Sequence, residues 1–300
     1  MLLAAGADRA ARDSQGRTPL ELAVRYGNRR VADALGGAFA AAAASSPAKP
    51  APLAPAPKIG EAIVTYLGHM GWAVRTANHF MVFDYDGRSV PPDEPSLANG
   101  SINPAEIKDL STTVFITHGH LDHYAPGVFD WKKTVKDIAY VAGFKPEGKE
   151  GYVFMAPRET KTLGGLDITT TMANDEGVGF FVKVDGVTIF HSGDHAAWTG
   201  GEENFKPEID FLAGRGLRAD LLFMPVSGTN DPAMNQGVHY AMTQLSAVAV
   251  FPGHVSGREE VYREFARDAA KAGMTTPIHC SEFAGDHFAV SGARAGAPSR

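Results

Sequence analysis

The sequence has a single cysteine and lacks both a long apolar run and an excess of basic residues. One cysteine among 300 residues excludes a disulfide framework and a zinc finger built from cysteines alone. No apolar run reaches the roughly 18 residues that a membrane-spanning helix requires, so no membrane span is expected. With 28 Lys and Arg against 34 Asp and Glu, the net charge of −6 argues against nucleic acid as a partner.

The chain does contain 11 histidines, and 44% of its residues are apolar. The apolar fraction is sufficient for at least one sizeable core in a chain of this length. Because cysteine cannot supply the ligands, any bound metal would be held by imidazole and carboxylate groups. The functional interpretation therefore depends on where the histidines fall.

Near the N-terminus, residues 16–23 read GRTPLELA, in which Thr18 can cap a helix that Pro19 begins. Together with residues 26–28 and 31–35, this segment resembles the turn and two helices of an ankyrin repeat. Only about one and a third repeats are present, whereas roughly three are usually needed for a stable array. The resemblance implies a protein-docking role, and a helical hairpin without function is the equally weighted alternative.

Six apolar runs are expected to form strands, at residues 61–67, 79–84, 112–117, 187–190, 220–224 and 247–251. One helix is well marked towards the C-terminus. Ser256 and Glu259 have the spacing of a capping box, and an apolar stripe from Val261 to Ala269 follows at helical spacing. Gly273 is expected to end this helix.

The densest chemical signal is the string THGHLDH, which directly follows an apolar run. It offers four potential ligands, namely His118, His120, Asp122 and His123. Gly119 lets the backbone bend tightly, and imidazole with carboxylate suits zinc, with iron or manganese as alternatives. Without a metal, this crowding of three histidines and an aspartate would be unfavourable. The string therefore predicts a metal site.

This string resembles the H-x-H-x-D-H signature of the metallo-β-lactamase fold superfamily. Two later strand ends carry matching motifs in order, HSGD at residues 191–194 and FPGH at residues 251–254. The opening YLGHMGW at residues 66–72, followed by FDY, is similar to the first hairpin of the lactonase-like branch of these hydrolases. The resemblance covers nearly all of residues 60–290. It implies an α/β fold of the αββα four-layer sandwich type, preceded by a short α-helical hairpin.

Four regions follow from the resemblance and from a stretch, residues 47–57, that holds five prolines and predicts an extended spacer. These regions are a partial ankyrin-like repeat at 1–37, an Ala/Pro-rich linker at 38–57, a metallo-β-lactamase-like hydrolase domain at 58–290 and a flexible tail at 291–300.

The resemblance also implies how the ligands are shared between two divalent metal ions. One ion would take His118 and His120, the second would take Asp122, His123 and His254, and Asp194 would bridge them. Zn²⁺ is the expected metal, with Fe and Mn as alternatives.

One departure concerns the first ion, to which the superfamily commonly supplies a third histidine. This chain has no histidine between His123 and His191. Asp175 occupies about the corresponding position, with Glu176 beside it, and a carboxylate there would favour a harder metal. A surface turn is the alternative interpretation for both residues.

Three further histidines, His69, His191 and His195, are expected near the site, where they would support a ligand or contact substrate. For His69, a role in the core is an equal alternative. The remaining histidines and the cysteine are expected to be structural or exposed, namely His79, His239, His279, His287 and Cys280.

The implied activity is that of a metal-dependent hydrolase. Metal coordination lowers the pKa of a shared water from about 15.7 towards about 7, and the resulting hydroxide attacks a carbonyl or phosphorus. Asp122 would help to accept the proton. A small-molecule ester, lactone, amide or phosphodiester is the expected substrate class, because the acidic charge and the altered first site disfavour a nuclease and a typical β-lactamase.

Two other functions stay open. One is a partner-binding scaffold, in which the ankyrin-like arm docks a protein and the metal-stabilised body has weak or no catalysis. The other is a di-iron redox enzyme on the same fold. No secretory signal is visible, so a cytoplasmic location is expected, although the partial repeat leaves open an exported form with a further N-terminal segment.

Overall fold

The computed structural model describes residues 7–12, 16–25, 28–36, 53–87, 94–199, 201–227 and 231–292. Its larger sheet contains β1 (Glu61–Gly68), β2 (Gly71–Arg75), β3 (His79–Phe83), β4 (Ser111–Ile116), β5 (Ile138–Ala142), β6 (Val153–Phe154) and β13 (His287–Ser291). The strand order is β13-β1-β2-β3-β4-β5-β6. Strands β13 to β3 pair antiparallel, whereas β3 to β6 pair parallel. The carboxyl ends of β3 and β4 therefore lie side by side at one edge.

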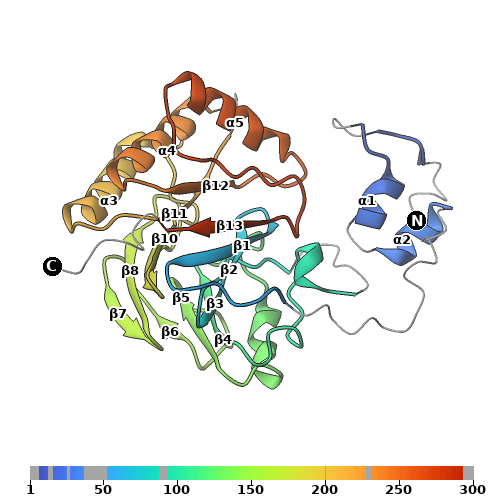
Figure 1. Cartoon of the computed structure of the whole chain (residues 1–300), viewed down its shortest axis with the longest axis horizontal. Helices are drawn as coiled ribbons and strands as arrows, with labels where there is room; N and C mark the ends of the chain where they lie inside the picture. Colours follow the sequence, from blue (N-terminus) through green and yellow to red (C-terminus); the bar gives the residue numbers. More distant parts are fainter. Residues whose placement is uncertain are drawn as a thin grey trace.

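The smaller sheet contains β7 (Thr160–Leu163), β8 (Leu166–Met172), β9 (Val178–Val184), β10 (Val187–His191), β11 (Leu221–Pro225) and β12 (Ala249–Gly253). Its order is β12-β11-β10-β9-β8-β7, with β10, β11 and β12 parallel to one another. The carboxyl ends of β10 and β12 thus share an edge, which faces the edge where β3 and β4 end (Figure 1).

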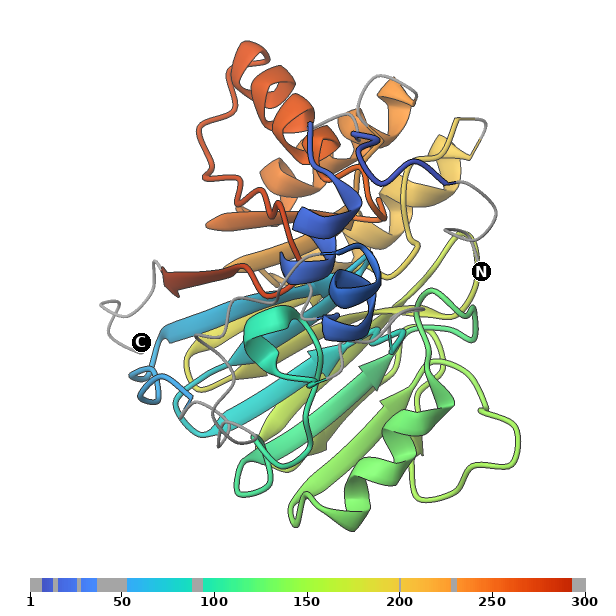
Figure 2. The same ribbon diagram turned by 90° about the vertical axis from the view of Figure 1, so that its right-hand side faces the viewer.

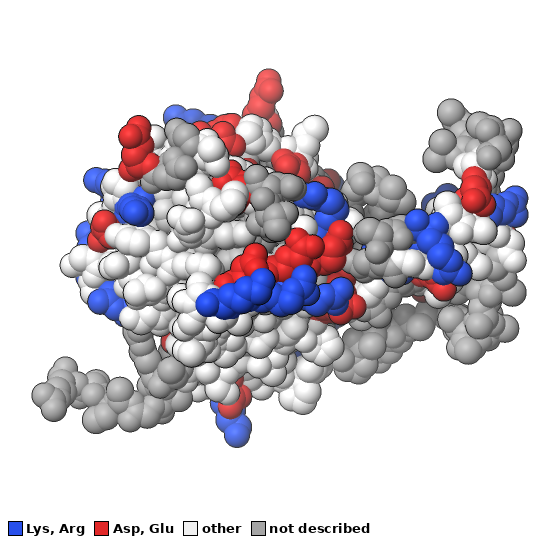
Figure 3. Space-filling view, turned by 90° about the horizontal axis from the view of Figure 1, so that it is seen from above, with Lys and Arg blue, Asp and Glu red and all other residues white. Residues whose placement is uncertain are grey.

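Helices and loops cover the outer faces of both sheets. Helices α3 (Glu202–Gly214), α4 (Pro232–Gln244) and α5 (Glu260–Lys271) lie over the smaller sheet, at the top of Figures 1 and 2. The 3₁₀ helices η3 (Leu97–Asn99) and η4 (Pro126–Lys133) lie on the side of the larger sheet, where η4 packs Val128, Phe129 and Trp131 against it. Seen from above, the helical face carries Lys and Arg side chains next to Asp and Glu side chains (Figure 3).

Aromatic side chains join the two sheets. Trp72, from β2, has no exposed surface, and its ring lies 5.2 Å from that of Phe223 and 5.4 Å from that of Phe251, both on the smaller sheet. Large aromatic side chains bury about 150–250 Å² each, so these contacts contribute much of the apolar burial between the sheets. The predicted α/β sandwich is confirmed, and η4 with loops forms the layer outside the larger sheet.

Most local predictions agree with the observed elements. All six predicted strands are present, although the last begins two residues later than predicted, at Ala249. The predicted helix is α5, and Gly273 follows its end with φ +80°. The predicted capping box is wrong: α5 begins after Glu259 without a side-chain cap. The Ser256 hydroxyl instead lies 3.1 Å from Nδ1 of His69, because the tertiary fold brings that ring to it.

The N-terminal segment forms two short helices, α1 (Pro19–Arg25) and α2 (Arg29–Ala34). Thr18 caps α1 as predicted, since its hydroxyl accepts from the Glu21 N–H at 3.2 Å. Residues 26–27 of the predicted turn, residues 38–52 of the predicted linker and residues 293–300 of the predicted tail lie outside the described residues, and the domain boundaries stay predictions. Within the described part of the chain, no helix is long and apolar enough to cross a membrane.

Candidate metal centre

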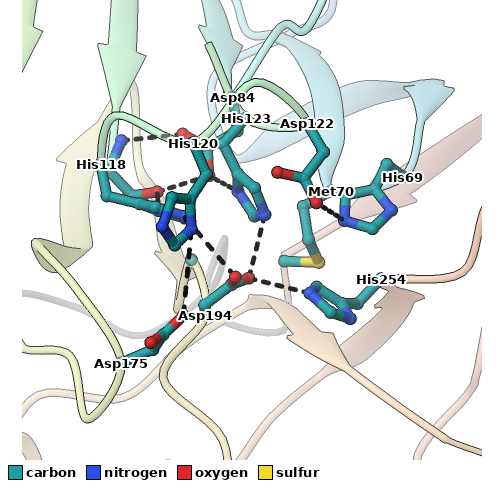
Figure 4. Close-up of polar contacts among 12 residues, drawn as sticks. His69, Met70, Asp84, His118, His120, Asp122, His123, Asp175, Asp194 and His254 are labelled. Carbon is teal, nitrogen blue, oxygen red and sulfur yellow. Dashed lines mark hydrogen bonds and ion pairs between the residues drawn. The ribbon is translucent and has the colours of Figure 1, made fainter.

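Polar side chains gather where strands of both sheets end. Asp84 follows β3, the THGHLDH segment follows β4, and Asp194 and His254 come shortly after β10 and β12. Figure 4 shows that these side chains point towards a common centre between the two sheets. The packing of the sheets therefore assembles groups that are far apart in the sequence.

The first cluster consists of His118, His120 and Asp194, whose ligand-type atoms all lie within 4.8 Å of one another. Nε2 of His118 is 3.0 Å from Nδ1 of His120 and 3.6 Å from Oδ2 of Asp194. His118 is fully buried, whereas half of the His120 side chain is exposed. The cluster therefore reaches from the interior to the surface.

The second cluster consists of His69, Asp122, His123 and His254, again within 4.8 Å. Nε2 of His69 lies 3.3 Å from Oδ2 of Asp122. The second carboxylate oxygen of Asp194, Oδ1, lies 3.0 Å from Nε2 of His123 and 3.3 Å from Nε2 of His254. Asp194 thus faces the first cluster with one oxygen and the second cluster with the other (Figure 4).

Asp84 supports the clusters through Thr117 and His123, and it is not among the site residues predicted from the sequence. It is fully buried, and its carboxylate accepts from the Thr117 N–H at 2.8 Å and from the Thr117 hydroxyl at 2.6 Å. Its Oδ2 also lies 2.9 Å from Nδ1 of His123. The signal available in the sequence is an aspartate directly after an apolar run. In the structure this residue has a φ of +43°.

The ionisable groups of the centre shift one another's pKa values. Burial disfavours the charged imidazole of His123, but its contacts with Asp194 and Asp84 outweigh this and raise its pKa to about 10. Burial opposes ionisation of Asp194, yet the His123 and His254 rings hold its pKa well below the usual value. The pKa of His69 is lowered to about 4 by burial and by the neighbouring rings of His254 and His123. A cation between these groups would complement the carboxylates without requiring protonated imidazoles.

Unpaired polar atoms support the same interpretation. Nε2 of His69, Nε2 of His123 and Oδ1 of Asp194 are buried without a well-formed hydrogen bond to the residues that the structure describes. Their close polar contacts are the ion pairs within the clusters, of His69 with Asp122 and of Asp194 with His123 and His254. Buried polar atoms normally have a partner, because leaving them unsatisfied costs about 1–3 kcal/mol each. These residues therefore fit the binding of metal ions.

The two acidic residues near the first cluster lie on the loop between β8 and β9. Oε2 of Glu176 is 3.2 Å from Nε2 of His120, and Oδ2 of Asp175 is 4.0 Å from Nδ1 of the same ring. Gly177 holds this loop against the β4 end, because its φ is +71° and a Cβ there would lie 2.0 Å from the Thr117 carbonyl oxygen. Both carboxylates are about half exposed, and neither lies in the two clusters defined above.

His191 and His195 are both fully buried. Nε2 of His191 lies 2.8 Å from the carbonyl oxygen of Met70, so this ring supports the turn that carries His69. Nε2 of His195 lies 3.1 Å from the Phe205 carbonyl oxygen in α3, away from both clusters. Neither ring has surface with which to touch a substrate.

The other histidines lie outside both clusters. His79 contacts Asp185, His239 packs on Phe265, His279 stacks on Phe251, and His287 is exposed on β13. Cys280 is partly buried, and its thiol lies 3.2 Å from the Tyr262 carbonyl oxygen.

Comparison with known proteins gives consistent results. A UPF0173 metal-dependent hydrolase of Rubrobacter xylanophilus is 26% identical over 251 residues, which cover 74% of this chain and 94% of the relative. Igni18, a metallo hydrolase of Ignicoccus hospitalis, is 18% identical with a TM-score of 0.56, and the match covers 77% of this chain and 98% of that structure. CmlA, a diiron β-hydroxylase of Streptomyces venezuelae, is 11% identical with a TM-score of 0.52, covering 79% and 55%. These two structural likenesses concern the fold alone.

The family model of the β-lactamase superfamily domain matches residues 63–254, which is more than half of the chain. The match spans the motifs on which the predicted resemblance depends, from the first hairpin to the last histidine. The predicted superfamily is confirmed, and the metal-dependent hydrolases among the relatives agree with the predicted enzyme class. By its sequence and its fold, this chain belongs to the β-lactamase superfamily.

Proposed function

We propose that this protein is a metal-dependent hydrolase whose centre holds two divalent cations, with Zn²⁺ as the expected metal. The observation that carries this proposal is the position of Asp194. Its Oδ2 faces His118 at 3.6 Å, and its Oδ1 faces His123 at 3.0 Å. A carboxylate whose two oxygens face separate sets of imidazoles is suited to bridging two cations.

The remaining ligands follow from the clusters. One cation would be held by His118 and His120, with Asp175 as the proposed replacement for a third histidine and Glu176 as its competitor. The other cation would be held by Asp122, His123 and His254. Glu176 lies nearer to His120 than Asp175 does, at 3.2 Å against 4.0 Å, so both carboxylates need separate tests.

When bound, the metal ions supply an acidified water at neutral pH and stabilise negative charge on a carbonyl or phosphoryl oxygen. The protein's own groups orient and protect this centre. Asp84 holds the His123 ring through Nδ1, and Thr117 anchors Asp84 with two hydrogen bonds. The carboxylate of Asp122, which is about half exposed, would accept a proton at the surface of the centre.

Access to the centre supports a small-molecule substrate. His120 and Asp122 are about half exposed, and Leu121 between them is 83% exposed. The ring of Trp198 lies 5.3 Å from that of His254. A small ester, lactone, amide or phosphodiester could approach the centre at the exposed His120 and Asp122, and an apolar portion of it could contact Leu121.

Metal analysis and a substrate panel test the proposal. The purified full chain should contain two zinc ions by elemental analysis and native mass spectrometry, and should hydrolyse at least one class in the panel. His120→Ala and Asp194→Ala should abolish hydrolysis while the far-UV circular dichroism spectrum stays native. His287→Ala, which alters an exposed histidine on β13, should leave metal content and hydrolysis unchanged. Normal turnover by metal-replete His120→Ala would contradict the proposal.

The same measurements address the alternatives. Carboxylates beside His120 suit a harder metal, so iron together with oxygen consumption would favour the di-iron redox enzyme. An active form without metal would reject both enzymes. For the scaffold alternative, pulldowns with the full chain and with a chain lacking residues 1–57 should differ if α1 and α2 dock a protein; identical partner sets would reject it.

A further inference from the structure

We propose that His69 is a direct ligand of the second metal ion, so that this ion is bound by three imidazoles, from His69, His123 and His254. The inference rests on the proposed function and adds a residue outside the motifs from which the other ligands were predicted. It also assigns different metal affinities to the two positions.

One ring nitrogen of His69, Nε2, lies among the groups of the second cluster. The side chain is 10% exposed, and Nε2 lies 3.3 Å from Oδ2 of Asp122. This atom is buried and has no hydrogen bond to the described part of the protein. It lies within 4.8 Å of the ligand-type atoms of Asp122, His123 and His254. An imidazole nitrogen in this position has the neighbours of a ligand.

The other ring nitrogen of His69 contacts a protein group outside the cluster. Nδ1 of His69 lies 3.1 Å from the hydroxyl oxygen of Ser256. When Nδ1–H donates to that oxygen, the lone pair of Nε2 faces the second cluster. Metal-binding histidines commonly donate their other N–H to a protein acceptor, which sets the ring orientation and the tautomer.

The structural histidine His79 provides a contrast. Its Nδ1 lies 3.0 Å from Asp185 Oδ2, and its Nε2 lies 3.0 Å from the Gly164 carbonyl oxygen. Both of its nitrogens are therefore satisfied by protein groups, as expected for a histidine with a packing role. His69 has a hydrogen-bond partner on Nδ1, whereas its Nε2 faces the Asp122 carboxylate at 3.3 Å, without a hydrogen bond to the described residues.

The imidazole rings of the second cluster pack closely together. The ring of His69 lies 4.5 Å from that of His254 and 5.2 Å from that of His123. The rings of His123 and His254 are 6.0 Å apart. A shared cation explains this arrangement better than packing does, because Nε2 of His69 and Nε2 of His123 lack well-formed hydrogen bonds to the described residues.

The backbone holds this arrangement under strain. His69 and His254 have φ angles of +49° and +73°, which are uncommon for residues other than glycine. The turn carrying His69 also lies against β12 so closely that a Cβ on Gly253 would come within 2.3 Å of Met70 Sδ. The strained turns place both rings on the same side of the second cluster.

The consequence is an unequal pair of metal positions. The second ion would have three imidazoles and the carboxylates of Asp122 and Asp194. The first ion would have two imidazoles, of which His120 is half exposed, and depends on Asp175 or Glu176 for completion. Because imidazole suits zinc better than carboxylate does, the second position should fill first. The first position thus has one imidazole ligand fewer than the superfamily commonly supplies, and the second position has one additional imidazole, from His69.

The experiment is a titration of the chelator-stripped full chain with Co²⁺, whose visible spectrum reports the coordinating atoms, and then with Zn²⁺. The wild-type chain should bind two equivalents with different affinities. In His69→Ala, the metal affinity of the tighter position should fall by more than about 100-fold. Loss of a group that only hydrogen-bonds to a ligand already lowers metal affinity by about 10–100-fold, and loss of a ligand should lower it further. The Co²⁺ spectrum of the first equivalent should change as well.

Two further variants keep the test decisive. Ser256→Ala removes only the group that orients the ring, and should weaken the same position by about tenfold. His279→Ala, at a ring stacked on Phe251 outside the clusters, should change neither affinity nor spectrum. Equal thermal unfolding of the stripped wild-type and variant chains would show that each variant folds.

The outcomes separate the inference from the proposed function. If His69→Ala keeps the tight affinity and the wild-type Co²⁺ spectrum while His254→Ala loses both, then His69 is not a ligand and the two-metal hydrolase stands. If the wild-type chain binds neither metal, the proposed function itself is wrong.

Discussion

The backbone N–H of His254 donates a hydrogen bond to the carbonyl oxygen of His69 at 3.1 Å, although the two residues follow strands of different sheets. This bond joins the ends of β1 and β12 at the metal centre. The geometry of the centre therefore depends on how the sheets pack, and in particular on aromatic contacts such as those of Trp72. Substitutions that leave the ligands intact can still alter the centre.

Asp84→Asn should lower metal affinity by about 10–100-fold, because the neutral amide cannot accept from both Thr117 and His123 as the carboxylate does. Asp220→Asn is a matched control. Asp220 is also buried and accepts from the Thr188 N–H and hydroxyl, each at 2.8 Å, but at the amino ends of β10 and β11. That control should cost about 1–3 kcal/mol of stability and leave metal affinity unchanged. Equal losses of affinity in both variants, measured by metal titration, would count against a specific role for Asp84.

Gly177→Ala should weaken the first metal position and destabilise the fold, because the new Cβ would collide with the Thr117 carbonyl oxygen and displace Asp175 and Glu176 from His120. Gly148→Ala is the control, since Gly148 also has a positive φ, +65°, but has open space around it. The control should lose only the roughly 1–2 kcal/mol of a left-handed backbone. Urea unfolding and metal titration of both variants measure the difference, and similar behaviour of the two would disprove the close contact.

Protonation of Asp185 should lower the free energy of unfolding as the pH falls below about 4. Burial opposes its ionisation, but hydrogen bonds from Thr76, His79 and Asn78 hold its pKa below the usual value. A carboxyl group with a lowered pKa contributes stability above its unfolded pKa of 3.8, and this contribution is lost as the pH falls towards the folded pKa.

The destabilisation caused by Asp185→Asn should therefore be largest near pH 6 and shrink as the pH falls through 4 towards 3. Asparagine tolerates the φ of +47° at this position, so backbone strain does not contribute to the measured change in stability. Denaturant unfolding at several pH values measures it, with the exposed Asp137→Asn as the control. If the difference in free energy of unfolding between Asp185→Asn and wild type does not change with pH, ionisation of Asp185 does not stabilise the fold.

Removal of metal with a chelator should lower the melting temperature. A ligand that binds only the folded state at 100 times its Kd stabilises by about 2.7 kcal/mol, which is about 5–10 °C for a domain of this size. Zn²⁺ should restore the wild-type value, and His123→Ala should show a much smaller response. Differential scanning fluorimetry provides the measurement, and an unchanged melting temperature after verified removal of metal would contradict the two-metal centre.

Much of the fold could be predicted because its signals are local. The apolar runs that became β1, β3, β4, β10, β11 and β12 are continuous in the sequence, and ligand-type residues follow several of them directly. Asp194 follows β10 of the smaller sheet and the THGHLDH segment follows β4 of the larger sheet. These strand-end residues converge when the two sheets of a sandwich place the ends of their strands along a common edge. The structure does bring these side chains together.

Contacts between the two sheets could not be predicted in this way. Ser256 has the local pattern of a helix cap, yet its hydroxyl lies at His69, 187 positions away. Asp175 was the expected neighbour of His120, whereas Glu176 lies closer to that ring. Local patterns carry no information on how closely two turns from separate sheets approach one another.

The amino-acid sequence therefore determined the class of fold, the residue types available to a metal and the strand ends from which they emerge, because periodicity and ligand chemistry are properties of short segments. The tertiary structure alone decided which atoms face one another. It placed Nε2 of His69 in the second cluster and the Asp84 carboxylate against His123, because burial of the aromatic side chains between the sheets sets the approach of residues that are distant along the chain.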